Sequence, residues 1–241
     1  AVERVDQAAD ALFYVTALFS IVSLFVEKGS YPLAYEVVQI SFAVFVAALF
    51  VIGLGSRLYW TPRAEDKRRQ DFFATACGVS LSHQKTDGYY NNDFAKPIQR
   101  MAAQVLENCH FSKAITLRMA HTERIKVGIY VLIWVLCMLC RQADVAWIVA
   151  VSQAVFSEQI LSKWFRLEWL RIRCEKVYDD VYRMFQSKPS GPNFNAMTLD
   201  SLGTYETANA TSGITLSSKL FHQMNDRLSV EWEQIKADLG I

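Results

Sequence analysis

The stretch "VVQISFAVFVAALFVIGLGS", residues 37–56, contains no charged side chain over twenty consecutive positions. The hydrocarbon core of a bilayer is about 30 Å thick, so a helix needs about 20 apolar residues to cross it. The length and composition of this stretch therefore predict a transmembrane helix, and this helix decides the class of the protein.

A second apolar stretch, "ALFYVTALFSIVSLFV", precedes it at residues 11–26 and has sixteen uncharged residues. The segment between the two, "EKGSYPLAYE", includes the Gly, Ser and Pro that are typical of a tight connection. We therefore expect a hairpin of two transmembrane helices. A cleavable signal peptide is the poorer interpretation of the first stretch, because its leading end is acidic and no small-x-small cleavage site comes before Glu27.

Two shorter apolar runs follow later in the chain, at residues 127–140 and 145–157, with fourteen and thirteen uncharged residues. Each run alone is short for a span. Lys126 and Arg141 stand at the edges of the first run, where long cationic side chains can reach the headgroups. We expect these runs to form a second transmembrane hairpin, with a soluble helical hairpin as the alternative.

Lys and Arg fall on one side of these four runs. The two short connecting loops hold only Lys28 and Arg141. Basic residues instead cluster just after the second and fourth runs: Arg57, Arg63, Lys67, Arg68, Arg69, Lys163, Arg166, Arg171, Arg173 and Lys176. Because cytoplasmic loops carry the excess of Lys and Arg, both termini and the central segment are predicted to face the cytoplasm. In a bacterium this membrane is the inner, or plasma, membrane.

The remaining segments have the periodicity of helices. Pro97 suits the first turn of a helix. Its predicted apolar face comprises Ile98, Met101, Ala102, Val105, Leu106 and Cys109. A second face comprises Ile160, Trp164, Leu167, Leu170, Cys174, Val177, Val181 and Phe185. A third, within residues 215–239, comprises Leu220, Met224, Leu228, Trp232, Ile235 and Leu239. Steps of three and four residues place each set on one side of a helix.

Helix boundaries follow from the same pattern. We expect Pro62 to stop or kink the second span, and the fourth run to continue as one helix from Val145 to Phe185. The Pro- and Gly-containing segment "QSKPSGPNFN", residues 186–195, reads as a linker. Ser229 is a candidate start for a separate last helix.

No strand alternation is persuasive, so the sequence predicts an all-α membrane protein. Its four transmembrane helices form two hairpins, and its helical cytoplasmic domain is built from the central segment and the C-terminal tail. The predicted divisions are residues 1–60 for the first hairpin, 61–124 for the central cytoplasmic segment, 125–162 for the second hairpin and 163–241 for the C-terminal cytoplasmic segment.

Composition and motifs exclude several functions. A formal net charge of +1 provides no field to recruit nucleic acid. Five scattered cysteines suit free thiols in a reducing compartment rather than a disulfide scaffold. None of the nucleotide-binding, metalloprotease or hydrolase motifs occurs, so we expect neither an enzyme nor a bound cofactor. Glu158 and Lys163 are candidates for lining a pore, although pairing or snorkelling at the membrane interface is the preferred interpretation.

Four segments are richer in Tyr, Asn, Ser and Thr than packing requires: "DFFATACGVSLS" (71–82), "GYYNNDF" (88–94), "ENCHF" (107–111) and "YETANATSGITLSSKLF" (205–221). Aromatic rings can stack on planar bases, and Asn amides can bind ring edges. The segment "GYYNNDF" could therefore hold a planar heterocyclic ligand, or it could be an ordinary turn.

The order of these segments resembles a known family. The blocks "RRQDFFATACGVSLS", "YYNND" and "LENCHFS", two apolar runs and the final "YETANA…ITLSSKLFHQMNDRLSVEW" are similar to the four-transmembrane effectors associated with bacterial cyclic-oligonucleotide (CBASS-type) antiphage operons. The resemblance covers nearly the whole chain. It implies a cytoplasmic part that binds a cyclic di- or oligonucleotide made during infection, and a membrane part that then permeabilises the inner membrane.

The resemblance also implies candidate ligand-binding residues, without separating ligand contacts from structural positions. They are Tyr89, Tyr90, Asn91, Asn92, Asn108, Phe111, Tyr205, Ser217 and Lys219, and Arg100 is added to the ligand-binding candidates as a nearby cation. Glu107, Glu206 and Asn225 lie in the same blocks. We expect a tyrosine of 89–90 to stack on a base and an asparagine of 91–92 to bind its edge. The candidates for binding phosphate are Arg68, Arg69, Arg100 and Lys219.

Two other functions remain open at this point. A membrane-anchored enzyme would need a convergent cluster of catalytic groups, and the sequence offers only scattered candidates. A constitutive small channel, transporter subunit or scaffold would not need so large a cytoplasmic part. Four thin helices can hardly enclose a water-filled path, so we expect a homo-oligomer, with a tetramer as the favoured stoichiometry.

Overall fold

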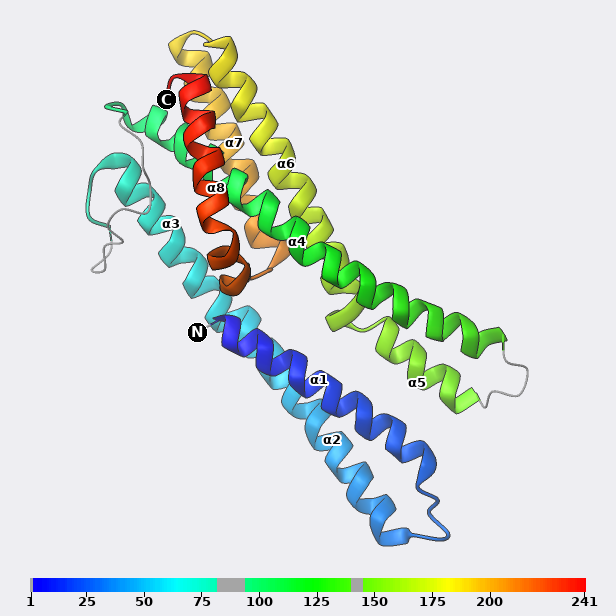
Figure 1. Ribbon diagram of the computed structural model, residues 1–241. Helices are drawn as coiled ribbons and strands as arrows, with labels where there is room; N and C mark the ends of the chain where they lie inside the picture. The colour runs from blue at the N-terminus through cyan, green and yellow to red at the C-terminus, as the bar shows by residue number, and fades with distance from the viewer. Residues whose placement is uncertain (1, 82–93, 140–144) are drawn as a thin grey trace. The chain divides into compact units, whose positions relative to one another are not determined.

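The computed structural model describes residues 2–81, 94–139 and 145–241, and the regular secondary structure in these ranges is entirely helical (Figure 1). The prediction of an all-α protein is confirmed. Contacts divide the chain into two compact units. Unit 1 comprises Ala1–Thr61 and Ala120–Phe165, and unit 2 comprises Pro62–Met119 and Arg166–Ile241.

Unit 1 begins with the predicted hairpin, formed by α1 (Val2–Phe25) and α2 (Pro32–Gly55). The two helices pack through the rings of Phe19 and Phe45, whose centroids are 5.0 Å apart. No residue of α2 is buried. Its large apolar side chains are exposed at Val37, Ile40, Val44, Val46, Phe50, Val51 and Leu54. Such a surface suits hydrocarbon rather than water.

Two helical runs are long and apolar enough to cross a membrane: Val2–Phe25 and Pro32–Cys77. No other helix in the described ranges meets this criterion. The structure therefore supports a membrane-type first hairpin, whereas the described parts of the third and fourth runs do not meet the same criterion.

The expectation was a stop or a kink at Pro62; the helix does not stop there, and its regular geometry is instead interrupted just before that residue. A π-helical turn, η1 (Ser56–Trp60), connects α2 directly to α3 (Thr61–Cys77). A π-helical turn holds an extra residue, and such turns occur where the regular hydrogen-bond ladder is interrupted, as it is by a proline without an N–H. The same turn brings Trp60 against Gly55, where an added Cβ would lie 2.7 Å from the indole ring.

The rest of unit 1 comes from the later apolar runs. It contains the end of α4 (Pro97–Leu139), α5 (Val145–Val155), the π-helical turn η2 (Glu158–Ser162) and the start of α6 (Lys163–Ser187). Trp134 on α4 donates a hydrogen bond to Ser152 on α5 over 2.8 Å. The ring of Phe25 contacts that of Trp147 at 5.1 Å, so α5 also packs against α1.

The expectation of one unbroken helix from Val145 to Phe185 is wrong. The helix ends at Val155, and Ser157 is extended, with φ −68° and ψ 162°. Phe156 packs edge-on against Trp134 at 5.6 Å, and Ile160 is buried with Phe13 and Val127. The break lets aromatic and aliphatic side chains on both sides of it pack inside unit 1, which the continuous periodicity did not predict.

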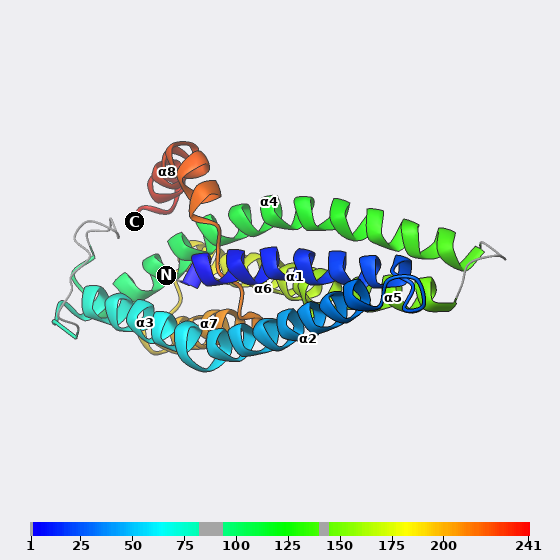
Figure 2. The same cartoon turned by 90° about the horizontal axis from the view of Figure 1, so that it is seen from below.

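Unit 2 is formed by α3, the first part of α4, most of α6, α7 (Gly191–Ser212) and α8 (Ser218–Leu239). Figures 1 and 2 show α4 between α8 on one side and α6 and α7 on the other. Every residue from Met101 to His110 is accordingly buried. The core includes Phe72, Val105, Leu106, Leu170, Cys174, Val177, Val181, Met184, Leu202 and Trp232.

Unit 2 confirms the predicted apolar faces and corrects two boundaries. Pro97 starts α4, and the faces predicted on α4, α6 and α8 supply much of the core. However, α7 begins at Gly191, inside the predicted linker, because Pro192 stands at the start of a helix, where a missing N–H is harmless. Helix α8 runs through Ser229 without a break, so no separate last helix starts there.

The cysteines are free thiols, as predicted, at the four positions that the structure describes: Cys77, Cys109, Cys137 and Cys174. Cys109 on α4 and Cys174 on α6 are both fully buried in the core of unit 2. Burial raises the pKa of the Cys109 thiol, and the neighbouring Cys174 raises it further. Cys109 therefore behaves as a small core side chain rather than as a reactive thiolate, and Cys174 packs in the same core.

Candidate functional site

The predicted ligand-binding residues fall into two groups. Tyr89, Tyr90, Asn91 and Asn92 lie outside the described residues. The other six lie in unit 2 on three different helices or at their ends: Arg100, Asn108 and Phe111 on α4, Tyr205 on α7, Ser217 before α8 and Lys219 in its first turn.

Several of these six side chains already have structural contacts. Tyr205 is 4% exposed. Ser217 caps α8, because its hydroxyl accepts a hydrogen bond from the backbone N–H of Leu220 at 3.4 Å. Arg100 donates to the carbonyls of Thr75 and Ala95 at 3.5 and 3.4 Å. These contacts hold helix ends and loops in place.

The other three differ in accessibility. Asn108 is buried on α4. Phe111 is half-buried against the core, with its ring 6.0 Å from that of Phe221. Lys219 is exposed. None of the six predicted residues that the structure describes lines the cavity of unit 2 that is described below.

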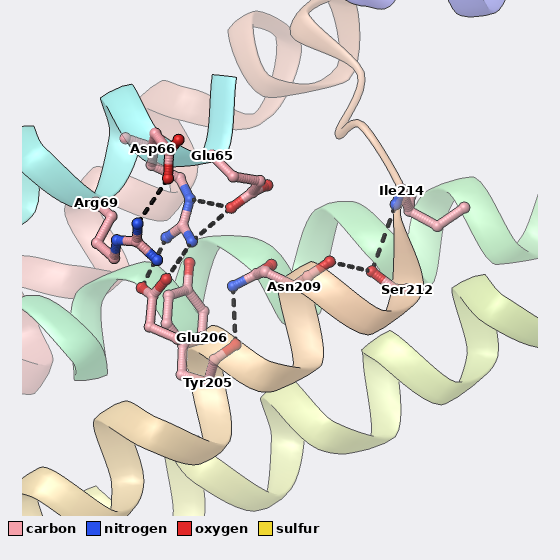
Figure 3. Close-up of polar contacts among 9 residues, drawn as sticks. Glu65, Asp66, Arg69, Tyr205, Glu206, Asn209, Ser212 and Ile214 are labelled. Carbon is pink, nitrogen blue, oxygen red and sulfur yellow. Dashed lines mark hydrogen bonds and ion pairs between the residues drawn. The ribbon is translucent and has the colours of Figure 1, made fainter. Parts of the chain in front are cut away.

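Two of the three arginines predicted to bind phosphate, Arg68 and Arg69, have carboxylate partners. Arg68 on α3 lies between Glu65 and Glu206, with its Nη2 atom 2.8 Å and 2.7 Å from their carboxylate oxygens (Figure 3). Its guanidinium carbon is 5.5 Å from the centroid of the Tyr205 ring. Arg69 pairs with Asp66 at 2.6 Å. The Arg68 cluster therefore joins α3 to α7.

The charge of Arg68 is strongly stabilised there. Burial alone lowers the pKa of Arg68, but Tyr205, Glu65 and Glu206 together raise it above its ordinary value. Close by, Asn209 donates to the carbonyl of Tyr205 at 3.0 Å, and the Ser212 hydroxyl donates to the carbonyl of Asn209 at 3.0 Å (Figure 3). The polar residues of this part of α7 thus bond to their own helix and its end.

A second polar cluster lies inside unit 2, on the buried stretch of α4. Within the described part of the chain, the amide of Gln104, one carboxylate oxygen of Glu107 and the Nδ1 atom of His110 are buried without a hydrogen-bond partner. The pKa of Glu107 is raised to about 8, mainly by burial. The nearby charge of Lys236 lowers this pKa, and that of Glu233 raises it. Burial also lowers the pKa of His110. Both side chains are therefore mostly neutral near pH 7.

Unit 2 also contains a cavity of about 520 Å³ where four of its helices end or begin. Figure 1 shows the start of α4, the turn from α6 to α7 and the end of α8 close together at one end of unit 2. The residues lining the cavity are Phe94, Lys96, Pro97, Ile98, Gln99, Met184, Phe185, Lys188, Pro189, Gly191, Phe194, Asn195, Leu239 and Gly240.

The lining of this cavity is aromatic and cationic. Phe94 and Phe185 stack with ring centroids 6.1 Å apart and planes at 13°, and Phe194 packs edge-on against Phe185 at 5.8 Å. Among the described residues of the lining, Lys96 and Lys188 are the charged ones, and none is Asp or Glu. This composition can hold a flat, negatively charged molecule.

Sequence reasoning missed most of this cavity, although one of its residues was in view. Phe94 is the last residue of "GYYNNDF". The other main contributors come from "MFQSKPSGPNFN", residues 184–195, whose larger part was interpreted as a linker because of its Pro and Gly. Two phenylalanines, two asparagines and a lysine in so short a segment were the available signal.

Two charge pairs connect the helices of unit 1. Lys163 Nζ lies 2.5 Å from an oxygen of Asp10 on α1, and Arg57 in η1 pairs with Glu158 in η2. Glu158 and Lys163 therefore each have an ion-pair partner, which confirms the preferred interpretation of the sequence. Both π-helical turns of the described chain thus take part in one ion pair.

Comparison with known proteins finds no match: no family model, no curated protein and no solved structure is similar to this chain.

Proposed function

We propose that the protein is a cyclic-nucleotide-gated membrane effector of bacterial antiphage defence, which permeabilises the inner membrane when its ligand binds. The observation that carries the proposal is the division of one chain into two units of opposite character. The hairpin of α1 and α2 exposes apolar side chains along its length, whereas unit 2 encloses a large core and a cavity fit for a small molecule.

In this proposal the membrane part has four spans in two hairpins, with both termini in the cytoplasm. Three contacts support a second hairpin that packs with the first: Trp134 with Ser152, Phe25 with Trp147, and the buried cluster of Phe13, Val127 and Ile160. The Trp134–Ser152 hydrogen bond satisfies two polar groups inside the bundle, as a low-dielectric surrounding requires.

The proposed membrane path is formed by several copies of the chain, with a tetramer favoured. The helices of unit 1 offer few polar side chains, so one copy supplies little of the lining that ions need. The ligand is a cyclic di- or oligonucleotide, and no catalytic step on it is proposed. Tyr89, Tyr90, Asn91 and Asn92 remain proposed ligand contacts.

The proposal is tested in cells. The chain is expressed in bacteria together with an inducible cyclic-oligonucleotide synthase, and membrane potential is followed with a voltage-sensitive dye. Depolarisation is expected only when an active synthase and the chain are both present; a catalytically inactive synthase is the matched control. Depolarisation with the inactive synthase would instead favour the constitutive channel, and no depolarisation in any combination would refute permeabilisation.

A further inference from the structure

We infer that the cavity bounded by α4, α6, α7 and α8 is a binding site for an anionic ligand with a planar ring, and that Lys188 and Lys96 bind its anionic groups. The inference deepens the proposed function, and rests on it only for the choice of cyclic nucleotides as ligands. All residues involved belong to unit 2 and are among the described residues.

The size and shape of the cavity suit a small molecule. Its volume of about 520 Å³ lies within the range typical of ligand sites, roughly 300–1,000 Å³. Phe94, Phe185 and Phe194 supply aromatic rings, of which Phe94 and Phe194 are only partly buried. A base can stack on such rings whatever its identity. The amides of Gln99 and Asn195 also line the cavity and can bind the edge of a ring.

The electrostatics favour a negative charge. Of the residues that the structure describes, two lysines and no carboxylate side chain line the cavity. The first turns of α4 and α7 also border it, through Ile98 and Gly191, and helix N-termini carry a partial positive charge. The C-terminal ends of α6 and α8 border it as well and offset that contribution. The preference for an anion therefore rests on Lys96 and Lys188.

Lys188 adds an independent observation. Its φ of 45° makes it the one non-glycine residue with a positive φ among the described residues. It follows directly on the last residue of α6, a position where glycine ends helices without steric cost. A lysine in this conformation is less favourable for folding than a glycine would be. Strained residues of this kind concentrate at binding sites, where the side chain is needed for another purpose.

The strained backbone and the positive charge of Lys188 predict that its replacement has opposite effects on stability and on ligand affinity. Replacing Lys188 by glycine removes the strain and the charge together. If the cavity binds an anion, Lys188→Gly should raise the melting temperature of the protein and weaken ligand binding at least about tenfold, the effect of one lost hydrogen bond to a charged group. Lys188→Asn, which also tolerates this conformation, serves as a second variant.

Binding is measured by calorimetry on the full chain in detergent. The probes are cyclic di-AMP, cyclic di-GMP and cyclic tri-AMP, with adenosine as a ring without charge and pyrophosphate as a charge without ring. At least one cyclic nucleotide is expected to bind more tightly than both partial probes. Phe194→Ala should weaken it about 5- to 150-fold. Lys176→Ala, at an exposed lysine of α6 outside the cavity, should leave affinity unchanged.

The outcomes separate this inference from the proposed function. Suppose that folded Lys188→Gly, Lys188→Asn and Phe194→Ala bind ligand and leak as the wild type does. The cavity would then not be the binding site, and the proposed ligand-gated permeabilisation would still stand. Binding that depends on these residues but causes no leakage would support the cavity as the binding site and contradict ligand-gated permeabilisation. If none of the cyclic nucleotides binds the wild-type chain, the inference is wrong.

Discussion

Arg68 binds Glu206 through both of its terminal nitrogens, with Nη2 2.7 Å from Oε2 and Nη1 3.1 Å from Oε1. This bidentate pair joins α3 to α7 while the guanidinium group covers the ring of Tyr205. Because one face of Tyr205 is already covered and the side chain is buried, its contribution is to the packing of unit 2. The same geometry directs both terminal nitrogens of Arg68 to carboxylate oxygens.

We predict that Arg68→Ala destabilises the protein by about 1–3 kcal/mol, because Glu206 would remain partly buried without its partner. Arg69→Ala is the matched control: its pair with Asp66 is more than half exposed and should contribute about 0–1 kcal/mol. Thermal unfolding in detergent measures both. Equal losses in the two variants would contradict the structural role of Arg68, and the Arg68→Ala/Glu206→Ala double variant should lose less than the sum of the single variants.

Glu107 should make stability depend on pH. Its pKa is raised from an ordinary 4.5 to about 8, so the folded protein holds a proton that the unfolded chain releases between these values. Stability contributed by the neutral carboxyl is therefore present below about pH 4.5 and is lost as pH rises through 8. Glu107→Gln should be more stable than wild type by about 2–4 kcal/mol at pH 9 and nearly equal to it at pH 5.

The comparison is made by thermal unfolding at both pH values. Asp180→Asn is the control, since Asp180 on α6 is an exposed carboxylate and is not among the groups that shift the pKa of Glu107. The difference between variant and wild type cancels the titration of His110, which both proteins share. A Glu107→Gln effect of the same size at pH 5 and pH 9 would show that the carboxyl is not protonated in the folded state.

The ion pairs of unit 1 should influence leakage. Asp10–Lys163 joins α1 to the start of α6, and Arg57–Glu158 joins η1 to η2. If these helices move apart when the proposed pore opens, the two pairs stabilise the closed state. Each partly exposed ion pair stabilises the closed state by about 0.2–1 kcal/mol. Losing one pair therefore changes the equilibrium constant between closed and open states by up to about fivefold. Arg57→Glu should therefore raise ligand-free leakage by up to that factor.

Charge exchange is the control for that prediction. The Arg57→Glu/Glu158→Arg double variant restores the pair with reversed sign and should return leakage to the wild-type level. Leakage that stays high in the double variant would mean that residue 57 acts through something other than its pair with Glu158.

The proposed topology predicts the location of fusion reporters. A reporter at residues 28–30 should be periplasmic, and one at the C-terminus cytoplasmic, because the connecting loops are poor in Lys and Arg. Residues 141–144 discriminate between the models of two and four spans. A periplasmic signal there is expected, and a cytoplasmic signal would leave only the first hairpin in the membrane.

The sequence predicted helix faces better than helix ends. The apolar positions of α4, α6 and α8 recur every three or four residues, so burial such as that of Leu106, Val177 and Trp232 follows from periodicity. The break at Ser157 has no local signal, because the packing of Phe156 and Ile160 against distant helices decides it. Similarly, Pro192 marked a loop in sequence but a helix start in the structure.

The candidate site was predicted less well than the fold. Tyr205 and Ser217 are polar residues that a ligand could use, but tertiary contacts assign them to packing and to a helix cap. The cavity combines residues from four helices, so only the tertiary structure places Phe94 and Lys188 near one another. Its clearest local mark, the positive φ of Lys188, is a property of the backbone and cannot be read from residue type.

The central claim is tested most directly by dye release from sealed vesicles that contain the purified full-length chain. Cyclic di-AMP, cyclic di-GMP or cyclic tri-AMP is added while release is recorded, with empty vesicles and protein without ligand as references. We predict little release without ligand and a saturable, concentration-dependent release with at least one of the three. Equal release with and without ligand, or none at any concentration, would contradict ligand-gated permeabilisation.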